Sequence, residues 1–411
     1  ASPQETRINI LSRIAAAPMP YEKIIRIDGE SGRLPVYAVL HRSQAGERLL
    51  PSWGKGVTPE LAFVSALMER IERYTASAID TRKHELIFGT CHSLQKMNAL
   101  SLWKLVPSNL LRVSQTKNET NNQRMPWIRC FSLSDQKDVL MPAHRVFFNS
   151  GYGQNDFSYT SGLASGNTLE EAVAHALCET IEHHFEDTIH WNKIKIPTVP
   201  KNSIMDPALK DLIRLIETTE NVRLCISYLS QGHDLPVFRV FGIPESPPYP
   251  DSFGFYISVG VHPDKNIALS RALTEFVQGR ISGEYRNTHG YDHIEYVPAF
   301  PKKIFSFYQN IIDLKKTVSF DSIPSHCYED ILDDIKLASK TIHQLGGKVI
   351  IKDLTHPRLG IPTVRVFALG LQPAILGVSI TRLSHKAACI SRHLTDYDEV
   401  TKILDRNLFE E

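Results

Sequence analysis

The chain has 411 residues, 42% hydrophobic and 22% charged, so it is long enough to bury a large core. Its 46 basic and 45 acidic residues leave a formal net charge of +1, which argues against nucleic-acid binding over the whole surface. No window approaches the ~18 uninterrupted apolar residues of a membrane span. The N-terminal ASPQETRINILSRIAAAP also lacks the apolar centre of a secretory signal. We therefore expect a cytoplasmic protein with neither nucleic acid nor membrane as a partner.

The cysteines are scattered along the chain, and no two of them form a CxxC pair. A structural zinc site requires closely spaced thiolates, so we expect no zinc site of that kind. Scattered thiols in a large chain are typical of reduced residues in the core. This interpretation applies to all six: Cys91, Cys130, Cys178, Cys225, Cys327 and Cys389.

In chain order, three stretches carry no clear periodicity. They are the N-terminus to about Pro20, residues 115–123 (QTKNETNNQ), and residues 244–252 (PESPPYPDS), whose four prolines disfavour helices and central strands. Apolar runs rich in β-branched and aromatic residues predict strands at 34–40, 127–133, 235–241, 256–261, 348–353 and 361–369. These strands alternate with helical patterns at uneven spacing, which indicates a mixed α+β or α/β chain rather than a β-sandwich.

Three helical stretches resemble one another. They are AFVSALMERIE (62–72), AVAHALCETIE (172–182) and ALSRALTEFVQ (268–278), and each contains Ala-Leu-x-Glu. Helix starts precede all three. Thr58 stands before a proline, Thr168 forms a capping box with Glu171, and Asp264 is a possible N-cap. The repeat is too widely spaced for a solenoid, so we expect related units assembled around one site.

Each repeat places polar side chains on one helical face, because residues three or four apart are neighbours there. The repeat brings together Glu69 with Glu72, Glu179 with Glu182, and Glu275 with Gln278, preceded by Ser65, His175 and Arg271. One such stripe usually faces water, but three matching stripes favour a shared site. Carboxylates from several helices suit Mg²⁺, and arginines suit phosphates. The apolar neighbours Leu61, Val64, Leu67, Met68 and Ile71 are expected to face the core.

Several other site types do not fit the sequence. Ferritin-like centres use Glu-x-x-His on two helices, whereas these helices carry Glu-x-x-Glu. The metalloprotease motif HExxH and the phosphate loop GxxxxGK[ST] are both absent. Any ATP would therefore be bound through side chains and a metal rather than through a P-loop.

These motifs resemble the YcaO family. GKGVTPELAFVSALMERIERY resembles its first nucleotide motif, with Ser65, Glu69, Glu72 and Arg73 in place. GLASGNTLEEAVAHALCETIE resembles the second, with Asn167 and Glu171 upstream of the two glutamates, and RALTEFVQGR resembles the third. KDLTHPRLGIPTVRVFALGL is similar to its C-terminal strand region. The resemblance covers about residues 50 to 385. It divides the chain into an N-terminal segment (1–50), a catalytic core (51–385) and a C-terminal tail (386–411).

The resemblance implies an α+β fold in which three glutamate-bearing helices pack on mixed sheets around one nucleotide site. YcaO proteins bind ATP and Mg²⁺, phosphorylate a backbone amide oxygen of a peptide, and let a nucleophile displace the phosphate. The catalytic and Mg²⁺-binding residues implied are Glu69, Glu72, Glu179, Glu182 and Glu275. The nucleotide contacts implied are Lys55, Ser65, Arg73, Asn167, Glu171, His175, Arg271, Gln278 and Arg280. One departure is His183, which stands where the second motif usually has arginine.

The nucleophile depends on the branch of the family. The chain ends in NLFEE rather than in the proline-rich tail common among azoline-forming members. The stretch GLASGNTLEEA is most similar to the thioamide-forming branch, which commonly works with a TfuA partner. Thioamidation of a peptide or protein, by a homodimer with a TfuA-like partner, is therefore the leading expectation. Azoline or amidine formation, a catalytically silent peptide-binding module and an unrelated metal-carboxylate hydrolase are the alternatives.

Overall fold

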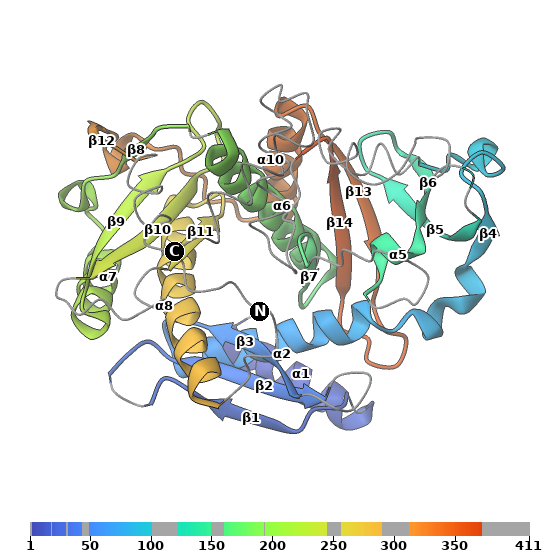
Figure 1. The fold of residues 1–411 in the computed structure, drawn as a ribbon, viewed down its shortest axis with the longest axis horizontal. Coiled ribbons are helices and arrows are strands. Elements are labelled where there is room, and N and C mark those ends of the chain that lie inside the picture. Colours follow the sequence, from blue (N-terminus) through green and yellow to red (C-terminus); the bar gives the residue numbers. More distant parts are fainter. Residues whose placement is uncertain are drawn as a thin grey trace, which may run out of the picture.

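The structure is a computed structural model (Figure 1). It describes residues 2–17, 19–29, 32–42, 49–100, 122, 124–148, 160–192, 194–244, 256–289 and 312–371. The α-helices of these described residues are α1 (Pro3–Ala16), α2 (Pro59–Ala76), α5 (Ala143–Val146), α6 (Leu169–Asn192), α7 (Pro207–Glu220), α8 (Lys265–His289) and α10 (Ile331–Gln344). None of the described helices is long and apolar enough to cross a membrane.

The strands form three sheets. The first has the order β1 (Lys23–Arg26), β2 (Val36–Arg42), β3 (Leu49–Lys55). The second has the order β11 (Ile257–Val261), β10 (Val237–Pro244), β9 (Val222–Tyr228), β8 (Ile196–Thr198), β12 (Ile312–Thr317). The third has the order β4 (Ile87–Gly89), β5 (Met125–Ser132), β13 (Lys348–Asp353), β14 (Thr363–Leu369), β7 (Leu163–Ser165), with β6 (Lys137–Pro142) paired to β5. The β8–β12 pair is parallel and the other described pairs are antiparallel, which confirms the mixed α+β class.

All six predicted strands are present, shifted by up to three residues at their ends. Pro35, Pro236 and Pro362 each stand immediately before a strand begins, where proline's missing N–H costs the sheet no hydrogen bond. The strands of three or four residues, β1, β4, β7 and β8, were not predicted, because so short a run carries little periodicity. The longer strands β3, β6, β9 and β12 were not predicted either. Residues 115–123, apart from residue 122, and residues 245–252 lie outside the described part of the chain, as does the tail 386–411.

The expectation that the N-terminus lacks regular structure is wrong, because it forms α1. Ser2 caps this helix, and its capping box with Glu5 satisfies donors at the helix start. Ile10 and Ile14 are buried against α2. The sequence Ser-Pro-Gln-Glu, a cap followed by proline and then glutamate, is the signal that could have predicted the helix.

The cysteine prediction is confirmed in part. Cys91, Cys130 and Cys178 are buried, Cys225 is half-buried, and Cys327 is exposed, which contradicts a core position for that residue. Cys389 lies outside the described residues.

Each glutamate-bearing helix follows a strand on which it packs closely: α2 follows β3, α6 follows β7, and α8 follows β11. Gly54 of β3 lies so near α2 that a Cβ atom there would be 2.1 Å from the Ala66 nitrogen. Gly260 of β11 meets α8 in the same way, 2.3 Å from the Ala268 oxygen. These three strand–helix units surround the middle of the molecule in Figure 1.

Candidate active site

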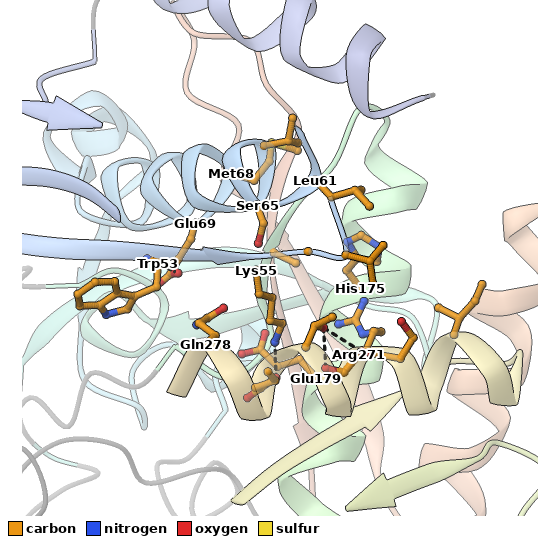
Figure 2. A pocket seen from close by; sticks show the side chains of 18 of the residues that line it. Trp53, Lys55, Leu61, Ser65, Met68, Glu69, His175, Glu179, Arg271 and Gln278 are labelled. Atoms are coloured by element: carbon orange, nitrogen blue, oxygen red, sulfur yellow. Dashed lines mark hydrogen bonds and ion pairs between the residues drawn. The ribbon is translucent and has the colours of Figure 1, made fainter. Parts of the chain in front are cut away.

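A cavity of about 1660 Å³ lies between α2, α6 and α8, with β3, α1 and α7 completing its wall. Ligand pockets are commonly ~300–1,000 Å³, so this one has room for a nucleotide and part of a second substrate. Figure 2 shows Ser65 of α2, Lys55 of β3 and Arg271 of α8 turned toward the same space. The cavity is lined by thirteen of the residues predicted from the sequence: Lys55, Ser65, Glu69, Glu72, Arg73, Asn167, Glu171, His175, Glu179, Glu182, Arg271, Glu275 and Gln278.

Arg280 is the exception. It does not line the cavity and instead is buried in an ion-pair network with Glu220 and Arg33. Its Nε donates to Glu220 Oε2 at 2.9 Å. The structure therefore gives no support to Arg280 as a nucleotide contact, because its guanidinium holds α8 to the end of α7.

Glutamates of α2 are held by hydrogen bonds from neighbouring strands. Glu69 accepts from the backbone N–H of Trp53 at 2.8 Å and pairs with Arg73 at 2.5 Å. Glu72 accepts from both the backbone nitrogen and the hydroxyl of Ser165, each at 2.9 Å. These contacts fix α2 carboxylates against β3 and β7, so their positions in the cavity are set by the sheets.

Glutamates of α6 and α8 are paired differently. Glu179 faces His183 one turn along α6, with 3.7 Å between its Oε1 and the imidazole Nε2. Glu275 of α8 is paired with Lys55, which reaches across from β3 (Figure 2). Three of the predicted Mg²⁺ ligands thus face a basic side chain of the chain itself.

Three acids of the site, including the paired Glu69, have raised pKa values. Burial and the nearby Glu179 raise the pKa of Glu72 to about 8. Burial also raises the pKa of Glu69. Burial and the neighbouring Glu275 raise the pKa of Glu182. Ionised carboxylates this close together repel one another, and a divalent cation bound between them would reduce that repulsion. This set of oxygen donors therefore fits Mg²⁺.

Nevertheless, no three histidine, cysteine or acidic side chains of the described residues are grouped closely enough to hold a metal ion as they stand. In the pairs Lys55–Glu275, Arg73–Glu69 and His183–Glu179, the carboxylate faces a protein cation. The roles of the five glutamates as metal ligands stay predictions.

Polar residues around the start of α6 also line the cavity. The carboxylate of Glu171 accepts from the backbone and side-chain nitrogens of Asn167 at 2.8 and 2.9 Å. The predicted capping box is therefore only half correct. Thr168 accepts from the Glu171 N–H, but the Glu171 side chain reaches past Thr168 to the residue before it. His175 is exposed to the cavity, and desolvation by the cavity walls together with Arg271 lowers its pKa to about 4.

Sequence reasoning missed several lining residues. Ser282 and Arg286 extend the polar stripe of α8 by one and two turns beyond Gln278, and Arg286 lies over the Trp53 ring at 5.7 Å. Both follow Gln278 at intervals of four residues, which predicts that they lie on the same face of α8. Of the apolar neighbours predicted to face the core, Leu67 and Ile71 are buried, and Val64 and Met68 pack against the same core cluster while also lining the cavity. The prediction is wrong for Leu61, which is exposed and lines the cavity.

A family model described as YcaO cyclodehydratase, ATP- and Mg²⁺-binding, matches residues 53–372, more than three quarters of the chain. A protein of Rhizobium leguminosarum bv. trifolii, described as uncharacterized in the tfuA 3′ region, is 24% identical over 346 residues. The match covers 79% of this chain and 77% of that one.

Two solved structures share the fold. YcaO from Methanopyrus kandleri bound with AMPPCP and Mg²⁺ has a TM-score of 0.71 at 24% identity and covers 90% of this chain and 91% of its own. A heterocyclase in complex with substrate and cofactor has a TM-score of 0.75 at 20% identity. The match covers 91% of this chain but 53% of the heterocyclase, so the chain spans about half of that protein's length. By the extent of the family match, this chain belongs to the YcaO family, whose members bind ATP and Mg²⁺.

Proposed function

We propose that this protein uses ATP and Mg²⁺ to activate a backbone amide of a peptide or protein, and that a sulfide donor then converts the amide to a thioamide. The observation that carries the proposal is the convergence of Glu69, Glu179 and Glu275, at equivalent positions of three related helices, on one cavity. The cavity also contains the cations that a triphosphate requires, among them Lys55 and Arg271.

The chemistry follows from the poor leaving ability of an amide oxygen. That oxygen attacks the terminal phosphorus of ATP, and ADP leaves. Sulfide then adds to the carbon, the carbon–oxygen bond breaks, and phosphate departs with the original oxygen. Mg²⁺ bound among the carboxylates would neutralise charge on the transferring phosphoryl group. Arg73 and Arg271 would orient the phosphates, and the enclosing helices would exclude water that could otherwise take the phosphoryl group.

The thioamide outcome is favoured by the relative from the tfuA 3′ region and by the GLASGNTLEEA motif. A TfuA-like partner, a homodimer and a cytoplasmic location belong to the same proposal. Azoline formation is the second candidate, because the family description names cyclodehydratases. In that reaction a Cys, Ser or Thr side chain of the substrate replaces external sulfide as the nucleophile.

The experiment is an intact-mass measurement of peptides and proteins encoded near this gene, after incubation with the protein, ATP, Mg²⁺, sulfide and any TfuA-like neighbour. A gain of about 16 Da, oxygen replaced by sulfur after phosphate loss, supports thioamidation. A loss of about 18 Da supports ring closure through the same phosphorylated amide. The Glu69→Gln/Glu179→Gln variant is the control and should give neither change. Modification without ATP would contradict the proposal.

A further inference from the structure

Helix α1 lies outside the part of the chain that the family model matches, yet it forms part of the cavity wall. Pro3 and Thr6 of its first turns line the cavity. The helix is attached to α2 by an ion pair between Arg7 and Glu60 at 2.8 Å. Its remote end is held by Arg13, which donates to the backbone oxygen of Gly360 at 3.0 Å. The wall that α1 supplies is therefore a fixed part of the described structure.

Thr6 is the polar contact between α1 and the predicted nucleotide residues. It is a buried residue, only 6% exposed. Its hydroxyl donates to the backbone oxygen of Ser2 at 2.9 Å, and it accepts from the side-chain nitrogen of Asn167 at 3.0 Å. Because its one proton is already engaged with Ser2, Thr6 can act toward Asn167 only as an acceptor.

This contact determines the orientation of the Asn167 amide. An amide nitrogen has two hydrogens, and here one is directed to Glu171 at 2.9 Å and the other to Thr6. A carboxylate can only accept, so the nitrogen must face Glu171 and Thr6. The amide oxygen of Asn167 then has no hydrogen-bond partner among the described residues, although Asn167 lines the cavity.

We infer that Thr6 is a positioning residue of the nucleotide site: through Asn167, it presents an acceptor oxygen to the nucleoside portion of ATP. The oxygens of the triphosphate are acceptors at neutral pH, whereas the ribose hydroxyls and the adenine amino group are the donors that ATP carries. The inference rests on the proposed ATP-dependent function and adds a specificity element from a helix outside the family match.

The test is calorimetric titration of the full chain with two probes in the presence of Mg²⁺, the non-hydrolysable analogue AMPPNP and inorganic tripolyphosphate. Thr6→Val keeps the shape of the side chain but leaves one Asn167 hydrogen without an acceptor. It should weaken AMPPNP binding about tenfold, the typical effect of one unsatisfied buried donor. Tripolyphosphate binding should be unchanged, because that probe lacks the nucleoside.

Two further variants separate positioning from mere structure. Thr6→Ser retains the acceptor and should bind AMPPNP within about twofold of the unmodified chain. Ser12→Ala, on the exposed side of the same helix, should do the same. Thr6→Ala serves as the second truncation if the valine variant unfolds at a markedly lower temperature.

The outcomes decide between this inference and the proposed function. If the unmodified chain binds AMPPNP and Thr6→Val binds it equally well, the inference is wrong and the proposed function stands. If Thr6→Val weakened the binding of AMPPNP and of tripolyphosphate equally, the inference would also be wrong, since Asn167 would then act on the metal or the phosphates. Failure of the unmodified chain to bind either probe would overturn both.

Discussion

Helices α2 and α6 carry the same pattern, a glutamate followed four residues later by a basic residue, but the two pairs differ in kind. In α2, Glu69 pairs with Arg73 at 2.5 Å, and Arg73 also donates to the backbone oxygen of Pro51. In α6, Glu179 faces His183 at 3.7 Å. Arginine stays charged at every physiological pH, whereas histidine does not. Equivalent positions of a repeat therefore provide one permanent and one titratable cation.

The difference shows how the cavity balances its charges. Burial alone would lower the pKa of His183, yet Glu179, Glu182 and Asp187 raise it to about 9. The histidine is thus cationic at neutral pH because acids of its own helix surround it. The third helix, α8, has no basic residue four positions after Glu275 and receives Lys55 from β3 instead. The first glutamate of each helix is therefore paired with a different kind of cation: Glu69 with an arginine, Glu179 with a histidine, and Glu275 with a lysine from a neighbouring strand.

The largest expected effect comes from the second glutamate of each pair. Glu72→Gln and Glu182→Gln keep the size of the side chain and remove a charge, and each should lower ATP-dependent turnover on the order of 100-fold or more. Because the pKa of Glu72 is raised, ionised Glu72 destabilises the folded chain above its ordinary pKa. At pH 8.5, the Glu72→Gln variant should therefore unfold at a higher temperature than the unmodified chain, although it loses activity.

Turnover and thermal unfolding, measured on the same samples, check this prediction. Glu170→Gln, an exposed glutamate of α6 outside the cavity, is the matched control and should change neither quantity. If Glu72→Gln lost activity and Glu182→Gln retained it, the two helices would not be equivalent in function. Loss of stability together with activity would indicate that these glutamates support the fold.

The repeat made most of this site predictable from the sequence, because identical offsets on a helix place side chains on one face. Arg280 shows the limit of motif matching. It follows Gln278 by two residues, which on a helix is nearly the opposite side, so periodicity argued against the cavity position that the motif suggested. The Arg73–Glu69 and His183–Glu179 pairs follow from the four-residue spacing on one helix, whereas the Lys55–Glu275 pair could not be predicted, because it depends on how β3 meets α8.

An intermediate effect, on the free energy of unfolding, is expected where the three units differ in the contact between strand and helix. Gly54 and Gly260 stand eight residues before Ala62 and Ala268, whereas the α6 unit has Ala164 eight residues before Ala172. Gly54→Ala would place a Cβ atom 2.1 Å from the Ala66 nitrogen, so α2 must shift. Overpacking of this kind typically costs about 1–3 kcal/mol in the free energy of unfolding.

Urea unfolding of Gly54→Ala measures that cost, and Ala164→Gly is its counterpart in the α6 unit. The second change creates no clash, so we expect a smaller loss, about 0.5–1 kcal/mol, from the added flexibility of glycine. Equal stability of Gly54→Ala and the unmodified chain would mean that α2 is free to move away from β3. The close approach would then not be what positions Glu69.

The smallest effect concerns the titratable pair itself. A raised histidine pKa means that the pair's stabilisation is fully present below about pH 6.5 and is lost as the pH rises through about 9. His183→Arg should remove this loss, so its advantage over the unmodified chain should grow between pH 7 and 9.5, by on the order of 1 kcal/mol for a partly exposed pair. Arg73→His should introduce the reverse trend on α2.

Thermal unfolding across this pH range measures both, and the difference between variant and unmodified chain cancels the titration of Glu72. If His183→Arg and the unmodified chain lost stability in parallel, His183 would not be the titrating cation, and the contrast between the two helices would be one of distance alone.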